Sequence, residues 1–250
     1  MRVLFLAGLL ALCAAAQTPS EPPALIRIVR SRFSAGHMDS LIQPYARAKA
    51  AVTVLGMSVV AGPPEAWVIE THDDFGSVED LDKALGTAAL AGIADLPDDK
   101  AWLGSATAVI ARYRAAWSYR PEQAIGALPR ARYLNATMYH AGSTANALAD
   151  IMRQRRQRAE RANVDLPGMT YEVVAGTLSG TCIILTPLAS LRAIDNALTR
   201  LPGATGESAP ASGATHENLL FRLEPGMSLV SDSFSSADPD FWRGKAGPAY

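Results

Sequence analysis

Short runs of apolar and β-branched residues, separated by turn residues, predict four strands in residues 24–122. Gly62-Pro63-Pro64-Glu65 lies between two such runs, so the second and third strands form a hairpin. Pro121 ends the fourth run, because proline cannot donate to a strand ladder. The predicted strands are 24–33, 53–61, 66–71 and 115–120.

Between these strands the apolar residues recur at helical spacing. The pattern over 37–51 predicts one helix, and the segment that starts at Ser77 with a capping-box pattern and runs to Leu85 predicts a second. A further helical stretch is expected over 98–112. The order is therefore strand, helix, strand, strand, helix, strand.

The same order recurs in the second half of the chain. Residues 203–215 are mostly Gly, Ala, Ser, Pro and Thr and predict a flexible loop in place of the longer helical insert of the first half. The predicted strands are 132–139, 170–175, 181–186 and 219–232, and the predicted helices are 145–161 and 190–201.

Similar short sequences support a duplication. Four pairs keep their order at separations of 106 to 114 residues: 33–36 with 139–142, 59–62 with 173–176, 82–85 with 195–198, and 112–118 with 222–228. A period close to the size of a small domain predicts two repeats, 24–122 and 130–235. Residues 236–250 then form a C-terminal tail whose Phe241 and Trp242 dock on the body.

A βαββαβ unit folds as a four-stranded antiparallel sheet with both helices on one face and its first and third strands in the middle. The other face of the sheet must be buried. Two such units can close these bare faces against each other into an eight-stranded, barrel-like core. The sequence therefore predicts an α+β fold of two ferredoxin-like repeats.

In element order and duplication, residues 24–235 resemble the dimeric α/β-barrel superfamily in its fused tandem form. The resemblance rests on no signature motif. It implies a pocket between sheet and helices, in a superfamily that includes cofactor-free oxygenases and haem enzymes. By analogy a haem-ligating histidine belongs in the second repeat, where only His140 and His216 are available and neither lies on a predicted helix.

The first residues are typical of a secretory signal. Arg2 precedes an apolar run of about ten residues, too short to span a bilayer, and Ala14-Ala15-Ala16 offers a cleavage site. We expect residues 1–16 to be removed, which leaves no transmembrane segment in the mature chain and a periplasmic or secreted protein. Lipid attachment at Cys13 is disfavoured by Leu12 before it. Cys182 is then a single thiol in an apolar run, expected to be buried and inert.

Composition and net charge limit the classes of partner that are expected. The chain is 49% hydrophobic and 19% charged, with a net charge of −1, and this gives no reason to expect nucleic acid. The basic run Arg153–Arg158 is interpreted as a solvated helix face. The sequence contains no metal-ligand, nucleotide-binding or nucleophile-elbow motif, so no metal or cofactor is expected.

Glu70 and His72 are the candidate catalytic residues. Strand alternation places them on one face of the third strand, where the acid can orient the imidazole. An offset of 113 residues puts Ile183 and Leu185 at the matching positions of the second repeat, and a central strand puts the pair near the barrel interior. The alternative is structural: Glu70 pairs with Arg27 or Arg30 of the neighbouring strand, while His72 lies at a solvated strand end.

Aromatic side chains on the predicted strands are the candidate ligand-binding residues, although aromatic residues on a sheet are also common as plain core. The candidates are Trp117, Tyr119, Tyr133 and Tyr139.

Three functional hypotheses follow. The preferred one is an exported, non-catalytic protein that binds a small, partly apolar molecule between its repeats. The second is a cofactor-independent oxygenase or isomerase with His72 as base and Glu70 to orient it. The third is a structural or partner-binding module. The oligomeric state, the ligand and any substrate stay open at this point.

Overall fold

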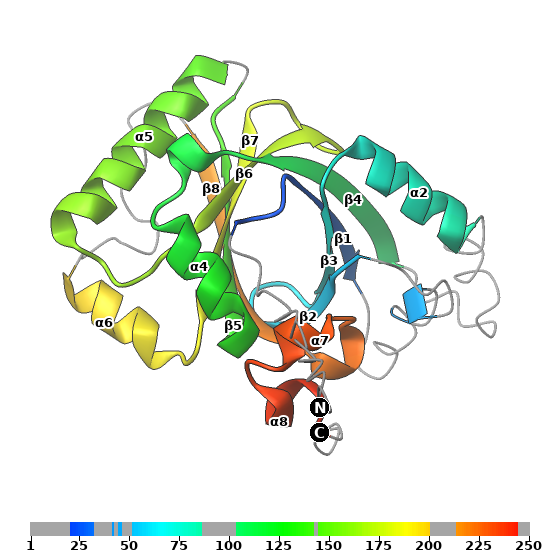
Figure 1. The fold of residues 1–250 in the computed structure, drawn as a ribbon. Coiled ribbons are helices and arrows are strands. Elements are labelled where there is room, and N and C mark those ends of the chain that lie inside the picture. The colour runs from blue at the N-terminus through cyan, green and yellow to red at the C-terminus, as the bar shows by residue number, and fades with distance from the viewer. Residues whose placement is uncertain are drawn as a thin grey trace, which may run out of the picture.

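A closed, eight-stranded antiparallel barrel forms the centre of the molecule (Figure 1). The computed structural model describes residues 21–32, 42, 45–46, 52–86, 104–142, 145–200 and 214–244. The strands are β1 (Leu25–Arg32), β2 (Val54–Ala61), β3 (Ala66–His72), β4 (Gly104–Tyr113), β5 (Tyr133–His140), β6 (Met169–Ala175), β7 (Thr181–Leu188) and β8 (Thr215–Leu223). The predicted α+β class and eight-stranded core are confirmed.

The order around the barrel is β1-β3-β2-β8-β5-β7-β6-β4. It divides into the group β4-β1-β3-β2, which we call the first half, and the group β8-β5-β7-β6, the second half. In each half the first and third strands in sequence lie in the middle, as the crossover rule predicts. Strand pairs β2–β8 and β4–β6 join the halves and leave no edge strand.

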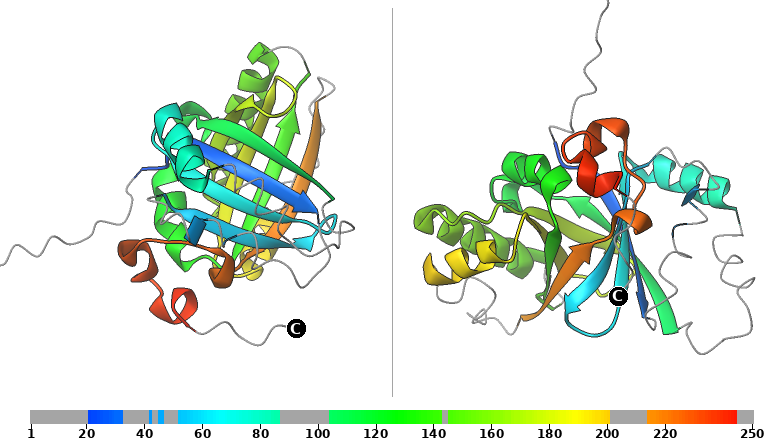
Figure 2. Two further views of the ribbon diagram at one scale, coloured as in Figure 1. Left: turned by 90° about the vertical axis from the view of Figure 1, so that its right-hand side faces the viewer. Right: turned by 90° about the horizontal axis from the view of Figure 1, so that it is seen from below.

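The described helices lie around the barrel, along the outside of its wall and at one end. They are α2 (Phe75–Leu85), α4 (Pro121–Ala127), α5 (Ala145–Ala162), α6 (Arg192–Arg200), α7 (Asp232–Ser235) and α8 (Pro239–Trp242), with 3₁₀ turns η2 (Ala115–Trp117), η3 (Leu128–Arg130) and η4 (Pro225–Met227). In Figures 1 and 2, α2 lies beside the first half and α5 and α6 lie beside the second. Among the described residues no helix is both long and apolar enough to span a bilayer.

Alternate residues of each strand point to opposite sides of the wall, and both sides are apolar. The interior is filled by a large cluster that includes Trp67, Tyr171 and Phe221. Outside the first half, Val68 packs with residues of α2, and outside the second half Cys182 packs with Met152 of α5. Each strand therefore has an interior face and a helix-facing side, and functional side chains can be assigned to one or the other.

The chain segments that follow the strands close one end of the barrel. Ile125 of α4 joins the interior cluster together with Phe234 and Trp242. The Trp242 indole Nε1 donates to the carbonyl oxygen of Pro129 at 2.6 Å, and Arg132 lies over the ring of Phe241. The prediction that Phe241 and Trp242 dock on the body is confirmed.

Three predicted elements are wrong. Residues 104–112 form β4 and not a helix, because Val109 and Ala111 pack into the barrel, where tertiary burial overrides the helix propensity of an alanine-rich segment. Residues 115–120 form η2 and a connecting segment, not a strand. The last strand, predicted over 219–232, runs from Thr215 to Leu223 and so begins within the expected loop.

Other predictions differ in extent. Helix α4 was not predicted, although Pro121 is well suited to a first helical turn. Helix α2 begins at Phe75, capped by Asp74, two residues before the predicted start. The residues predicted as a helix over 37–51 and the signal segment 1–16 lie outside the described residues, apart from residues 42 and 45–46.

Two of the duplicated motifs have the same local structure in both halves. Gly62 and Gly176 follow β2 and β6, with φ of 139° and 96°, in the region that favours glycine. The segments 112–118 and 222–228 each carry a strand end followed by a 3₁₀ turn. The sequence similarity therefore marks turns where the backbone demands are strict.

Gly56 of β2 is predicted to be intolerant of a side chain. A Cβ atom there would lie 2.2 Å from the carbonyl oxygen of Met227, because η4 packs directly on the strand. We expect Gly56→Ala to lower the free energy of unfolding by about 1–3 kcal/mol, measured by urea denaturation. Gly126→Ala in α4 is the control, because a Cβ there meets nothing within 4 Å. Equal midpoints for the two variants would contradict the packing.

Candidate functional site

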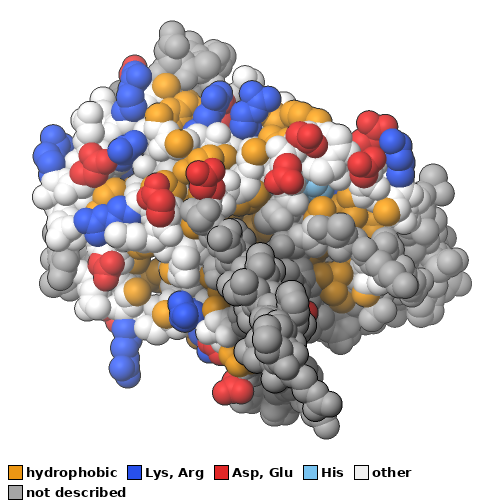
Figure 3. Space-filling model, viewed as in Figure 1, with side chains coloured by type: hydrophobic (Ala, Val, Ile, Leu, Met, Phe, Trp, Pro, Cys, Tyr) orange, Lys and Arg blue, Asp and Glu red, His pale blue; other side chains and the backbone are white. Residues whose placement is uncertain are grey.

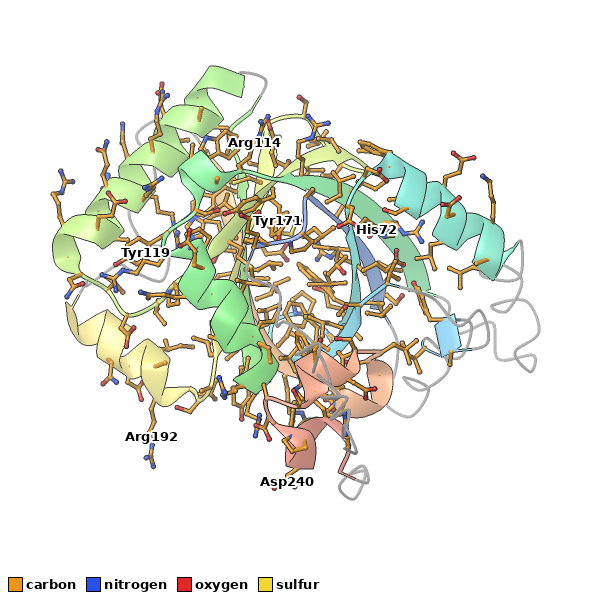
Figure 4. All side chains as sticks on the ribbon, viewed as in Figure 1. His72, Arg114, Tyr119, Tyr171, Arg192 and Asp240 are labelled. Carbon is orange, nitrogen blue, oxygen red and sulfur yellow. The ribbon has the colours of Figure 1, made fainter. Side chains whose placement is uncertain are left out.

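Glu70 and His72 lie on the helix-facing side of β3, not in the barrel interior. Their neighbour Ile69 belongs to the interior cluster, whereas Val68 packs toward α2, and alternation puts Glu70 and His72 with Val68. The expected interior position is therefore wrong. Figure 4 shows His72 between the wall and α2, and Tyr171 within the barrel.

The offset of 113 residues between the halves also fails at this strand. Ile183 is an interior residue, so it cannot match Glu70, which points outward. When two strands are aligned one residue out of step, the inward-facing residues of one are matched with the outward-facing residues of the other. With an offset of 114, as between Val59 and Val173, Glu70 matches Ile184, which packs on the helix-facing side of the second half.

The Glu70 carboxylate is fully enclosed by donors. Arg27 of β1 donates to it through Nε at 2.5 Å and through Nη2 at 3.2 Å. The Tyr45 hydroxyl donates to Oε1 at 2.5 Å, and His72 Nε2 lies 3.1 Å from Oε2. The side chain of Glu70 has no exposed surface. We call Arg27, Tyr45, Glu70 and His72 the first-half charge network.

His72 links this network to the start of α2. Its Nδ1 lies 3.3 Å from Oγ of Ser77, the third residue of α2, whose hydroxyl and backbone form a reciprocal capping box with Asp74. The imidazole side chain is completely buried. Both ring nitrogens thus contact groups of the chain, and the alternative of a solvated strand end is wrong for His72.

Electrostatics favour an ionised Glu70. Burial by itself would raise the pKa of Glu70, but the hydrogen bonds from His72 and Arg27 outweigh it and hold this pKa below its usual value. Burial and the nearby carboxylate raise the pKa of the Tyr45 hydroxyl, so Tyr45 stays a neutral donor. The expected pairing of Glu70 with an arginine of the neighbouring strand is found with Arg27.

Arg30, the other arginine considered as a partner of Glu70, lies elsewhere. Its guanidinium is 3.1 Å from Glu65 and 3.7 Å from Glu217 of β8, and it lies over the ring of the interior residue Trp67. It therefore connects the two halves at the barrel wall.

The second half carries a cavity of about 300 Å³ on its helix-facing side. The described strands β5, β7 and β8 form its floor, and α5, α6 and the segment after α5 contribute its walls. Its polar lining residues are Asn135, Thr137, Tyr139, Arg155, Thr186 and Asn218. Its apolar lining residues are Ala61, Leu166, Leu188, Ile194 and Leu220.

Hydrogen bonds order the cavity floor. The Thr137 hydroxyl donates to Oδ1 of Asn218 at 3.0 Å, and the Asn135 amide lies 3.4 Å from the Thr137 oxygen. Tyr139 stacks on His216 with ring centroids 5.6 Å apart. Strands β5 and β7 hold the same central places in the second half as β1 and β3 hold in the first, so this cavity stands where the first half has its charge network.

The four candidate aromatic residues do not gather in one place. Only Tyr139 lines the cavity. Trp117 lies in η2 with Arg114 over its ring, and the buried Tyr119 donates its hydroxyl proton to the carbonyl oxygen of Val164. Neither lies on a strand of the barrel, contrary to prediction. Tyr133 is the first residue of β5, and its predicted role stays a prediction.

The cavity does not have the side chains that usually hold haem. Haem iron is bound by histidine, cysteine, methionine or tyrosine, and among the described lining residues only Tyr139 is of these types. His216 stacks on Tyr139 at its edge, and His140 lies beside Thr181. We therefore assign no haem to this cavity. The described residues also contain no cluster of metal-ligating side chains.

Sequence reasoning missed the cavity residues. Asn135 and Thr137 alternate with apolar residues on β5, a polar, outward-facing pattern that could have been noticed. Asn218 lies between the loop predicted over 203–215 and the strand predicted over 219–232, where no element was assigned. Arg155 was absorbed in a basic run interpreted as solvated. The single cysteine behaves as predicted: Cys182 is buried, and burial raises the pKa of its thiol to about 12.

Comparison with family models and with curated protein sequences found no match. Solved structures do match. An anthrone oxidase-like protein superposes with a TM-score of 0.55 and 10% identity, over 82% of this chain and 93% of its own. A Fusobacterium nucleatum protein provisionally named a monooxygenase superposes with a TM-score of 0.53 and 8% identity, over 81% of this chain and 93% of its own. A protein provisionally named a chlorite dismutase superposes with a TM-score of 0.51 and 12% identity, over 85% of this chain and 98% of its own.

These matches show that the closed α/β barrel of this chain is a fold shared with those proteins. At such low identity the likeness concerns the fold alone, and the chemistry of this chain must come from its own residues. On the face shown in Figure 3, acidic and basic side chains are interspersed, in keeping with the net charge of −1.

The first-half charge network is predicted to support stability in a pH-dependent way. We expect Glu70→Gln to lower the free energy of unfolding at pH 7 by about 1–3 kcal/mol, because Arg27 loses its buried partner and keeps only the more exposed Asp82 of α2 as its described counter-charge. The pKa of Glu70 is lowered in the folded state, so the network contributes fully above its unfolded value of 4.5 and is lost as pH falls through the lower folded value. The gap between wild type and variant should therefore narrow in acid.

Urea denaturation at neutral and acidic pH tests this expectation. The control is Glu79→Gln on the exposed face of α2, where the carboxylate pairs only with Lys83 four residues on. It should leave the midpoint nearly unchanged at both pH values. A Glu70→Gln variant as stable as wild type at pH 7 would show that the network contributes nothing.

Proposed function

We propose that the chain binds a small, partly apolar organic molecule in the helix-facing cavity of its second half. The observation that carries this proposal is the cavity itself, which combines an ordered amide and hydroxyl floor with leucine and isoleucine walls. Ligand sites of soluble proteins are mostly apolar hollows with a few placed polar groups, and 300 Å³ lies at the small end of their size range.

The difference between the halves supports this choice. In the first half, the charges on β1 and β3 satisfy one another within the network around Glu70. In the second half, the corresponding strands present neutral polar groups toward a hollow. Such groups hold an incoming molecule without the cost of breaking a buried ion pair.

A cofactor-independent oxygenase or isomerase is the second candidate function. It is supported by the names of two structural neighbours, one an anthrone oxidase-like protein and one provisionally named a monooxygenase. No described lining residue is an imidazole or carboxylate base. The activity therefore needs a substrate that ionises readily by itself, or a proton transfer to a group outside the described lining. The earlier assignment of His72 as base stays a prediction.

Two further parts of the proposal concern organisation and location. The two halves are two ferredoxin-like repeats, a view supported by their equivalent strand orders and by the duplicated motifs. Residues 1–16 direct export, a view supported by their charge and apolar pattern. A mature N-terminus at Gln17 in protein from an exporting host would support this step.

The binding proposal predicts a ligand in the purified protein. Native mass spectrometry of the chain from an exporting host should show a defined mass above that of the protein. Thr137→Phe fills the cavity floor and should remove this adduct, whereas Thr215→Phe, at the exposed start of the same barrel wall, should retain it. The same adduct in all three proteins would refute binding in this cavity.

Oxygen uptake separates the two candidate functions. With anthrone as probe, a cofactor-independent oxygenase should consume oxygen in the wild type and not in Thr137→Phe. Adduct formation without uptake favours binding alone. If the protein shows neither an adduct nor oxygen uptake, the structural or partner-binding module is favoured.

A further inference from the structure

Arg155 is the single charged side chain among the described residues that line the cavity. It lies on α5 and is half-buried. Its neighbours on the helix have acidic partners: Arg153 pairs with Asp150, and Arg156 pairs with Glu160. Asp150 and Glu160, the carboxylates of α5 nearest to Arg155 in sequence, are therefore engaged by these other two arginines. The basic run is solvent-exposed at Arg153 and Arg158, as predicted, whereas Arg155 is half-buried and lines the cavity.

The positive charge of Arg155 acts on the side of α5 that faces the wall. The guanidinium lowers the pKa of the buried Cys182 thiol on β7, although burial outweighs this and leaves that pKa raised. Cys182 packs with Met152 of α5 beneath the helix. A positive field in a partly enclosed hollow attracts anions, because the low dielectric strengthens charge interactions there.

The uncharged lining residues indicate what the uncharged part of the ligand consists of. Leu166, Leu188 and Leu220, with Ile194, form an apolar wall that favours a hydrocarbon body. The floor of Asn135, Thr137 and Asn218 offers amide and hydroxyl groups and no carboxylate. No described group of the cavity therefore repels an anion, and one attracts it.

We infer that the cavity takes a small aromatic or aliphatic monoanion, a carboxylate or phenolate, whose charged group pairs with Arg155 and whose body lies against the leucine wall. This inference rests on the proposed function and names its ligand class. A planar guanidinium binds a carboxylate through two parallel hydrogen bonds, which gives orientation as well as affinity. An ionised ligand also supplies the readily ionised substrate that the oxygenase alternative requires.

Matched probes test the charge directly. Calorimetric titration of the full chain with 2-naphthoate and with 2-naphthamide compares two molecules of nearly the same shape that differ in charge. We expect the wild type to bind 2-naphthoate at least about tenfold more tightly, the value of one charge-assisted hydrogen bond. This comparison needs no variant, so it does not depend on how a substitution folds.

Variants assign the effect to one residue. Arg155→Gln should weaken the affinity for 2-naphthoate about tenfold or more and leave the affinity for 2-naphthamide within about twofold of the wild-type value. Arg155→Lys should retain part of the preference, since it keeps the charge but loses the planar fork. Arg153→Gln, two residues away on the exposed face, is the matched control and should bind like wild type.

The failures are distinguishable. If 2-naphthoate and 2-naphthamide bind equally well and Arg155→Gln changes neither, the anion inference is overturned while binding in the cavity stands. If neither probe binds and the purified chain carries no adduct, the proposed function fails, and the ligand class fails with it.

Discussion

Closure of the barrel is the constraint on which the other features depend. Strand pairs β2–β8 and β4–β6 join the halves, so every strand is hydrogen-bonded on both sides and no edge is left to pair with another chain. Closure also buries one face of each strand in a common interior filled by residues such as Trp67 and Phe221. The opposite face of each strand is then left to pack against the helices.

Polar groups on the helix-facing side are accommodated differently in the two halves. In the first half a carboxylate is buried, and Arg27, Tyr45 and His72 surround it, so the polar atoms satisfy one another and fix α2 through Ser77. In the second half, neutral amide and hydroxyl groups line a hollow with Arg155 at its side. The first arrangement pairs its buried polar atoms with one another, and the second places polar groups on the surface of a cavity.

The structural neighbours share the barrel of this chain, and its cavity is lined by residues of its own. Structures with about one residue in ten identical share the barrel, and two of those neighbours bear oxygenase-type names. The cavity of this chain offers an arginine, amides and hydroxyls, and no imidazole or carboxylate among its described lining residues. The likeness to these structures concerns the barrel alone, whereas the proposed ligand of this chain depends on the side chains that line its own cavity.

The sequence by itself determined the strand periodicity and the hairpins at Gly62 and Gly176, because these depend on local pattern and backbone freedom. The barrel-like core was predicted from the order and duplication of these elements. It also placed Glu70 and His72 on one face. Only the tertiary structure decided which face that is, since a one-residue slip exchanges interior and exterior. The same holds for residues 104–112, a strand because neighbouring strands hold them, and for Arg155, whose surroundings come from segments distant in the chain.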